Sequence, residues 1–157
     1  FPDALSLDAS IRSEVLLEED NVCIAAGNHP SIKSRISMRQ YASERHAAVF
    51  YKSEGPGVID TILAQKGLTR HLAVLAPHFA SVPFIVAESD LIATVPRRLA
   101  ARFKKELKLQ VLPVPFTIPP FRLSMLWHER VDSDPAHAWL RGLFVETTLK
   151  DRRTVVP

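Results

Sequence analysis

Short apolar runs alternate with stretches of helical spacing over the first 115 residues of the chain. The runs of strand length are 14–17, 22–26, 46–51, 71–76, 91–95 and 109–114, and the helices predicted between them are 37–42, 57–66, 81–87 and 97–105. Gly67 stands where a left-handed residue would end the second of these helices. Because the connections are short, the pattern predicts an α/β layer structure with a mostly parallel sheet.

A proline-rich stretch interrupts this alternation. Pro113, Pro115, Pro119 and Pro120 fit neither a central strand nor a helix interior, so we interpret 112–120 as a connector between two lobes. Residues 121–127 then alternate as a strand with one apolar face. We expect Ser133 to cap a final helix. The apolar face of that helix carries Ala136, Trp139, Leu140, Leu143 and Phe144.

Composition and charge narrow the class of protein. With 157 residues, 46% hydrophobic and 24% charged, the chain is long enough to bury a core and is no disordered tail. Its net charge of +3 does not by itself indicate nucleic-acid binding. We interpret the basic positions of helix 97–105 as a solvated face. The single cysteine, Cys23, excludes a disulfide framework and fits a reducing compartment. Because the chain starts at Phe1 without a methionine, we expect a fragment or a processed product.

The usual catalytic and metal-binding patterns are missing from the sequence. It contains no G-x-S-x-G turn, no P-loop and no H-E-x-x-H helix. No two of its six histidines have the helical i, i+4 spacing of a zinc site. We therefore predict no catalytic residue, no metal and no cofactor. No apolar run approaches the roughly 18 residues of a membrane helix, so we also expect no membrane partner.

One histidine has a setting that favours ligand binding. His78 follows Pro77 and precedes Phe79, at the point where a predicted strand ends and a helix is about to begin. Ligands of open α/β sheets bind outside the carboxyl ends of the strands. A ring with a donor and an acceptor beside a phenyl group could hold a polar aromatic molecule, and the alternative is a hydrogen-bonded loop histidine. His46, just before a strand, is a weaker candidate.

Several motifs occur in a characteristic order over about 130 residues. In chain order they are NHP at 28–30, GLTR at 67–70, PHF at 77–79, DLIATVPRR at 90–98, WHER at 127–130 and DPAHAWLR at 134–141. Together they resemble the effector-binding domain of LysR-type transcriptional regulators. The resemblance is greatest to regulators that sense aromatic acids, nitroaromatics or plant flavonoids.

The resemblance implies a type 2 periplasmic-binding-protein-like fold with two α/β subdomains, each with a central, mostly parallel sheet. Residues 1–18 would end subdomain I and form the first crossover, 19–115 would be subdomain II, and 116–157 would form the return crossover and the C-terminal part of subdomain I. Subdomain I would be incomplete, which would leave the apolar face of the last helix exposed. An effector such as an aromatic acid, a phenol or a flavonoid-like compound would bind in the cleft between the subdomains. The contacts that we expect are Pro77, His78 and Phe79, with His46, Ile118 and Phe121 less firmly.

The same resemblance implies a cytoplasmic bacterial regulator that forms a homodimer or homotetramer. It would bind DNA only through an N-terminal winged helix-turn-helix that this chain lacks. A solute-binding protein of a transport system shares the fold and is the alternative prediction. An enzyme reusing a two-lobe fold is a third possibility, but the sequence shows no converging acid, base or nucleophile to support it.

Overall fold

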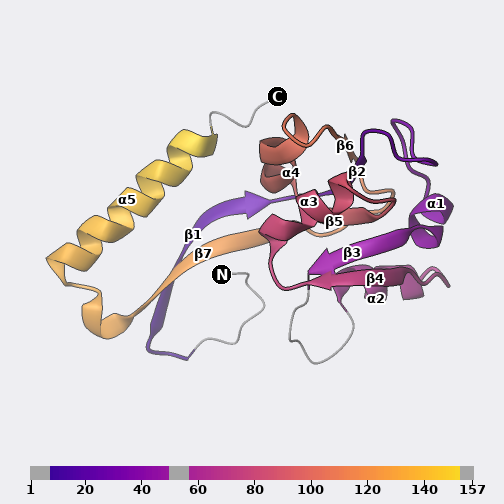
Figure 1. The fold of residues 1–157 in the computed structure, drawn as a ribbon. Coiled ribbons are helices and arrows are strands. Elements are labelled where there is room, and N and C mark those ends of the chain that lie inside the picture. The colour runs from indigo at the N-terminus through magenta and orange to yellow at the C-terminus, as the bar shows by residue number, and fades with distance from the viewer. Residues whose placement is uncertain (1–7, 50–56, 153–157) are drawn as a thin grey trace. The chain divides into compact units, whose positions relative to one another are not determined.

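A computed structural model describes residues 8–49 and 57–152 of the chain, with side chains described up to residue 149 (Figure 1). The chain divides into two compact units. Unit 2 is the continuous segment Asp20–Pro119, whereas unit 1 combines Phe1–Glu19 with Pro120–Pro157. The unit boundaries therefore follow Glu19 and Pro119, while the sequence prediction put them after residues 18 and 115.

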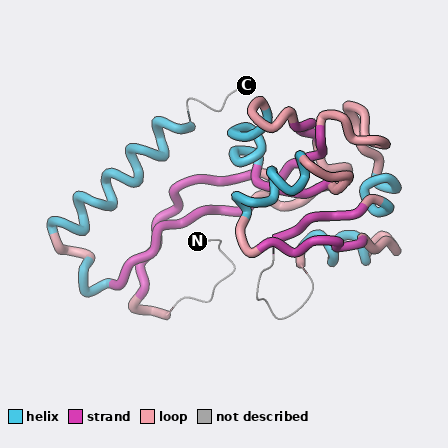
Figure 2. The backbone as a smooth tube through the Cα atoms, in the orientation of Figure 1, coloured by secondary structure: helices cyan, strands magenta, loops and turns pink. Residues whose placement is uncertain are grey.

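Unit 2 is a five-stranded sheet covered by helices on both faces. Its strand order is β4 (His71–Ala76), β3 (Arg45–Val49), β5 (Ile92–Pro96), β2 (Asn21–Ala26) and β6 (Leu109–Leu112). The helices are α1 (Met38–Ser43), α2 (Val58–Ala64), α3 (Val82–Ala87) and α4 (Arg97–Lys104), with a 3-10 turn, η1 (Phe79–Ser81), before α3. Figure 2 shows these short helices in cyan against the magenta strands. The predicted α/β alternation is thus confirmed, apart from residues 50 and 51, which lie outside the described part of the chain.

Four of the five strands point in the same direction, as a mostly parallel sheet requires. β3 pairs in parallel with both β4 and β5, while β2 runs antiparallel to its two neighbours, β5 and β6. The reversed strand is the one through which the chain enters unit 2, so no crossover helix precedes it. Hydrophobic periodicity carries no information on strand direction, which is why the sequence did not reveal this exception.

β2, in the interior of the sheet, is buried on both faces. Val22 and Ile24 belong to one core cluster, with residues of α3 and α4, while Cys23 and Ala25 belong to the other, with Tyr41 of α1. Alternate residues of a strand point to opposite faces, so a continuous apolar run is what a doubly covered strand needs. This explains why the run at 22–26 has no polar position.

Local signals fix the ends of two helices. Ser37 and Gln40 form a capping box at α1: the Ser37 hydroxyl accepts from the Gln40 amide at 3.2 Å, and the Gln40 carboxamide oxygen accepts from the Ser37 amide at 3.1 Å. After α2, Gly67 adopts a φ of +68°, as predicted, and the Leu68 amide donates to the Leu63 carbonyl at 2.9 Å.

Unit 1 contains an antiparallel strand pair and the long last helix. β1 (Ile11–Glu19) pairs with β7 (Phe121–His128), from Glu19 opposite Phe121 to Ile11 opposite His128. The two strands run in opposite directions because one enters unit 2 and the other leaves it, so in its described residues unit 1 has no parallel sheet. A 3-10 turn, η2 (Glu129–Val131), leads to α5 (Pro135–Arg152).

The predicted cap of the last helix is wrong by one residue. The Asp134 carboxylate accepts from the His137 amide at 2.9 Å, and the Asp134 carbonyl accepts from the Ala138 amide at 2.9 Å, so Asp134 rather than Ser133 caps α5. Pro135 at the first helical position sets this geometry. The expected exposure of the apolar face is confirmed: Trp139 is 67% and Phe144 is 51% exposed.

Candidate functional site

The turn after β4 presents an exposed histidine at the carboxyl edge of the sheet. β4 ends at Ala76, Pro77 follows, and His78 has an extended backbone (φ −138°, ψ 142°) before η1. The Ser81 side chain fixes this turn by donating to the His78 carbonyl at 2.8 Å. Within the described part of the chain no hydrogen bond engages the His78 ring. Its two ring nitrogens are therefore available to a polar ligand.

The neighbours of His78 differ in their exposure. Phe79 is half-buried and packs against the core cluster that contains Val82 and Val86, so its ring is held in place. Pro77 is exposed. The turn thus combines a fixed phenyl group with a solvent-facing imidazole, an arrangement suited to a small molecule that is both apolar and polar.

His46 is placed differently from the His78 turn. It lies near the start of β3, opposite Leu72, whereas the His78 turn follows Ala76, which pairs with Val49 at the other end of the same ladder. The His46 side chain is fully buried, with an exposed fraction of 0%. The structure therefore does not bring the two histidines together, and an effector contact by His46 stays a prediction.

The imidazole of His46 belongs to a buried polar network that sequence reasoning missed. Its Nε2 donates to the Tyr41 carbonyl at 2.8 Å, while Nδ1 has no hydrogen-bond partner among the described residues. Burial lowers the pKa of His46 to about 4, so the ring is neutral at pH 7. The Tyr41 hydroxyl lies 2.7 Å from the Thr94 hydroxyl, and burial raises the pKa of Tyr41 to about 12.

An ion pair stands beside this network. Arg70 Nε and Nη2 donate to the two carboxylate oxygens of Asp60 at 2.7 and 3.0 Å, a bidentate geometry. The hydrogen bond from Arg70 holds the pKa of Asp60 below its usual range. Burial opposes the charge on Arg70, but the bond to Asp60 outweighs it, so the pKa of Arg70 is raised. No periodicity links residues that come from α2 and from the loop before β4, so the sequence carried no signal for this pair.

The two remaining predicted contacts lie in different units. Ile118 is half-buried in the connector of residues 113–119, which belongs to unit 2. Phe121 is half-buried at the start of β7 in unit 1, where it pairs with Glu19. Their roles as effector contacts stay predictions.

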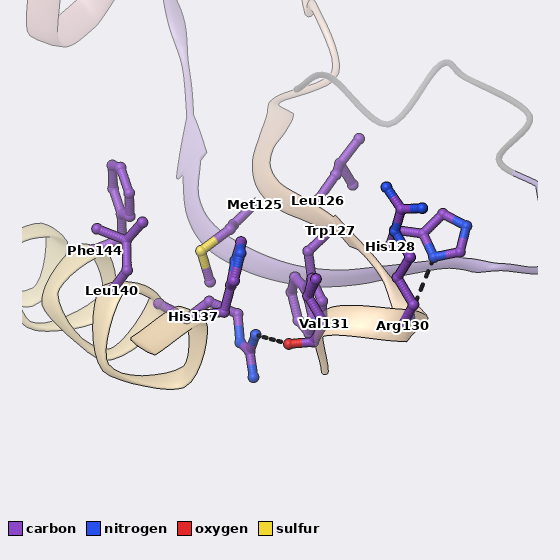
Figure 3. Close-up of a pocket in the computed structure, with 10 residues that line it drawn as sticks. Met125, Leu126, Trp127, His128, Arg130, Val131, His137, Leu140 and Phe144 are labelled. Carbon is purple, nitrogen blue, oxygen red and sulfur yellow. Dashed lines mark hydrogen bonds between the residues drawn. The ribbon is translucent and has the colours of Figure 1, made fainter. Parts of the chain in front are cut away.

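A groove lies elsewhere, within unit 1 (Figure 3). It has a volume of about 470 Å³ and is formed by β7, η2 and α5. Arg141 closes one side, with its guanidinium 4.7 Å from the centre of the Trp127 ring and Nη2 donating to the Asp132 carbonyl at 2.6 Å. Leu140 and Phe144 also line the groove, and none of the six predicted contacts does.

A second, smaller pocket of about 320 Å³ lies in unit 2, where the 28–30 loop meets residues 87–90. His29 is buried there. Its Nδ1 accepts from the Ser31 and Ile32 amides at 3.3 and 3.2 Å, so Nε2 carries the proton and donates to the Asp90 carbonyl at 3.1 Å. His29, the histidine of the NHP motif, therefore links the 28–32 loop to the turn between α3 and β5.

The remaining side chains give no sign of covalent or metal chemistry within the described residues. No group of three or more His, Cys, Asp or Glu side chains there is placed to hold a metal ion. Cys23 is fully buried, and burial raises the pKa of its thiol to about 12, so it remains protonated. Of the helices in residues 8–49 and 57–152, none is long and apolar enough to cross a membrane.

Comparisons with known proteins agree with this fold. A family profile described as "LysR substrate binding domain" matches residues 2–148. The HTH-type transcriptional activator NagR of a Ralstonia species is 37% identical over 125 residues, which are 80% of this chain and 42% of NagR. The chain therefore spans less than half the length of this relative.

Two solved structures are similar to this fold. The probable transcriptional regulator PA0477 from Pseudomonas aeruginosa superposes with a TM-score of 0.79 at 32% identity, over 92% of this chain and 47% of that chain. The regulatory domain of MexT, a transcriptional activator in the same organism, gives a TM-score of 0.75 at 26% identity, over 92% of this chain and 69% of that chain. The expected α/β, periplasmic-binding-protein-like fold is thereby confirmed. The chain belongs to the LysR substrate-binding domain family of transcriptional regulators.

Proposed function

We propose that this chain is the effector-sensing part of a bacterial LysR-type regulator and binds a small aromatic acid, phenol or flavonoid-like compound. The observation that carries the proposal is the turn at the end of β4. There, an exposed imidazole stands next to a phenyl ring that is fixed on the core. His78 would donate a hydrogen bond to the carboxylate or phenol oxygen, while Phe79 would contact the aromatic ring.

The proposed response is a shift of population rather than a reaction. We propose the inter-subdomain cleft that the family resemblance implies as the effector site, with Ile118 and Phe121 as further contacts. An effector favours the arrangement of the subdomains for which it has the higher affinity, and it shifts the equilibrium only by that difference. The regulators that match this chain are not enzymes, and they give no support to the alternative of a solute-binding protein.

We further propose that the part of the regulator outside this sequence supplies DNA binding, oligomerisation and the rest of subdomain I. Two observations support this. The chain spans 69% of the MexT regulatory domain but only 42% of NagR. The apolar face of α5, with Trp139 and Phe144 about half exposed or more, is what an incomplete subdomain leaves uncovered. The whole protein would act in the cytoplasm as a homodimer or homotetramer.

Calorimetric titration of the full-length regulator tests the effector site. The panel is benzoate, salicylate and phenol, with cyclohexanecarboxylate as the non-aromatic acid. We expect at least one aromatic member to bind and His78→Ala to weaken its binding by about tenfold to a hundredfold, the cost of a lost hydrogen bond to a charged group. His71→Ala is the matched control, since His71 is exposed at the opposite end of the same strand. Failure of every aromatic compound to bind, or equal losses in both variants, would refute the assignment.

A further inference from the structure

The connector between β6 and β7 is held on unit 2 by two side chains. Residues 113–119 form neither helix nor strand, and their prolines supply no backbone N–H to a hydrogen-bond ladder. Val114 and Phe116 pack against the core cluster of α1 and α2. Phe116 is the later of the two, and Ile118, a proposed effector contact, follows it by two residues.

Phe116 packs against Tyr41, a buried tyrosine with several contacts of its own. The two rings meet edge to face, with centroids 5.0 Å apart and an interplanar angle of 86°. Tyr41 is fully buried and is held at three points: its hydroxyl by Thr94 of β5 at 2.7 Å, its carbonyl by His46 Nε2 at 2.8 Å, and its ring by the His46 ring at 4.7 Å. These bonds fix Tyr41 relative to both β3 and β5.

We propose that Tyr41 is a positioning residue that seats Phe116 and thereby sets where the connector presents Ile118. The proposal rests on the function proposed above only for the role of Ile118. Tyr41 itself is fully buried, so in this proposal it acts through Phe116. The hydroxyl contributes to this role, because its bond to Thr94 ties the ring under Phe116 to β5.

A nitroxide spin label attached at Thr117→Cys in the 157-residue chain tests whether the packing of Phe116 on Tyr41 holds the connector in place. Thr117 is exposed and lies between Phe116 and Ile118, while the native Cys23 is fully buried, so the label reacts at the new thiol. We expect a mostly immobilised electron paramagnetic resonance spectrum. Phe116→Ala should raise the mobile fraction about tenfold, since the aromatic pair and part of a buried phenyl surface are lost together. Tyr41→Phe should raise it less, because the ring contact remains.

The matched control is Phe84→Ala. Phe84 also pairs edge to face with an aromatic ring in unit 2, Phe103, at 5.3 Å, but it lies on α3. The Phe84→Ala substitution should leave the spectrum of the label unchanged. An unchanged spectrum in Phe116→Ala or in a folded Tyr41→Phe variant, or equal mobility in Phe84→Ala, would overturn the proposal. The Phe116 change lies on the connector side, so it remains informative even where Tyr41→Phe impairs folding. No effector is added, so the result is independent of the calorimetric test.

Discussion

Replacing His46 with glutamine should change how the stability of unit 2 depends on pH. The buried imidazole has a pKa of about 4, against an ordinary value of 6.5. Between these values the unfolded chain binds a proton that the folded chain does not bind. The contribution of neutral His46 is therefore complete above pH 6.5 and is lost as the pH falls towards 4. Integration of this difference gives a loss of about 2.5 kcal/mol between pH 7 and pH 4.5.

The glutamine variant isolates this contribution. Its amide N–H can donate to the Tyr41 carbonyl in place of Nε2, and it does not titrate. At pH 7 the variant should be less stable than the native chain by about 1 kcal/mol, because the packing of two rings is lost. At pH 4.5 the glutamine variant should be the more stable protein. Only the native chain has a buried histidine that takes up a proton more readily on unfolding. The charged groups that face His46, Arg70 and Asp60, are the same in both proteins.

The assay is urea denaturation followed by far-ultraviolet circular dichroism at pH 7.0, 6.0, 5.0 and 4.5 (chosen to span the titration) and constant ionic strength. Tryptophan fluorescence is unsuitable, because Trp127 and Trp139 both lie in unit 1. His71→Gln, at an exposed position of the same unit, serves as the control and should follow the native chain. A stability difference between the native chain and His46→Gln that stays constant with pH would refute the reasoning.

Two further substitutions test local features by the same denaturation assay at pH 7. Gly67→Ala should cost about 1 kcal/mol because φ is +68°, whereas Gly142→Ala, inside α5 with open space around it, should be neutral or stabilising; equal effects would contradict this. Asp60→Asn should cost about 2 kcal/mol by leaving the buried Arg70 without its charge partner. Asp90→Asn, in a half-exposed pair, should stay within about 0.5 kcal/mol, and a larger loss there than at Asp60 would be the contrary result.

Local signals in the sequence predicted most of the secondary structure. The left-handed Gly67 and the strand at His71–Ala76 follow directly from residue type and periodicity. The errors arise where the outcome depends on partners. The reversed direction of β2 depends on which strands it joins, and the choice of Asp134 over Ser133 as the cap depends on where Pro135 starts the helix. The direction of β2 depends on tertiary pairing and the cap of α5 on the residue that starts the helix. Hydrophobic periodicity encodes neither.

The candidate site was predictable only in part. His78 was found because a strand end followed by a helix start is visible in the sequence, and the carboxyl edge of a sheet is a general place for ligands. The Tyr41–Thr94 bond joins residues 53 positions apart, so neither spacing nor composition points to it. The burial of His46 was hidden for the same reason: it depends on α1 folding back over the start of β3.

The continuity of unit 2 makes it a cassette inserted into unit 1 (Figure 1). Glu19 and Phe121 are direct cross-strand neighbours. Deletion of unit 2 therefore leaves two chain ends that a tight hairpin turn can join. Conversely, the excised cassette retains all five strands and both core clusters. Cutting the gene at these two points therefore gives a single continuous segment that contains the complete five-stranded sheet.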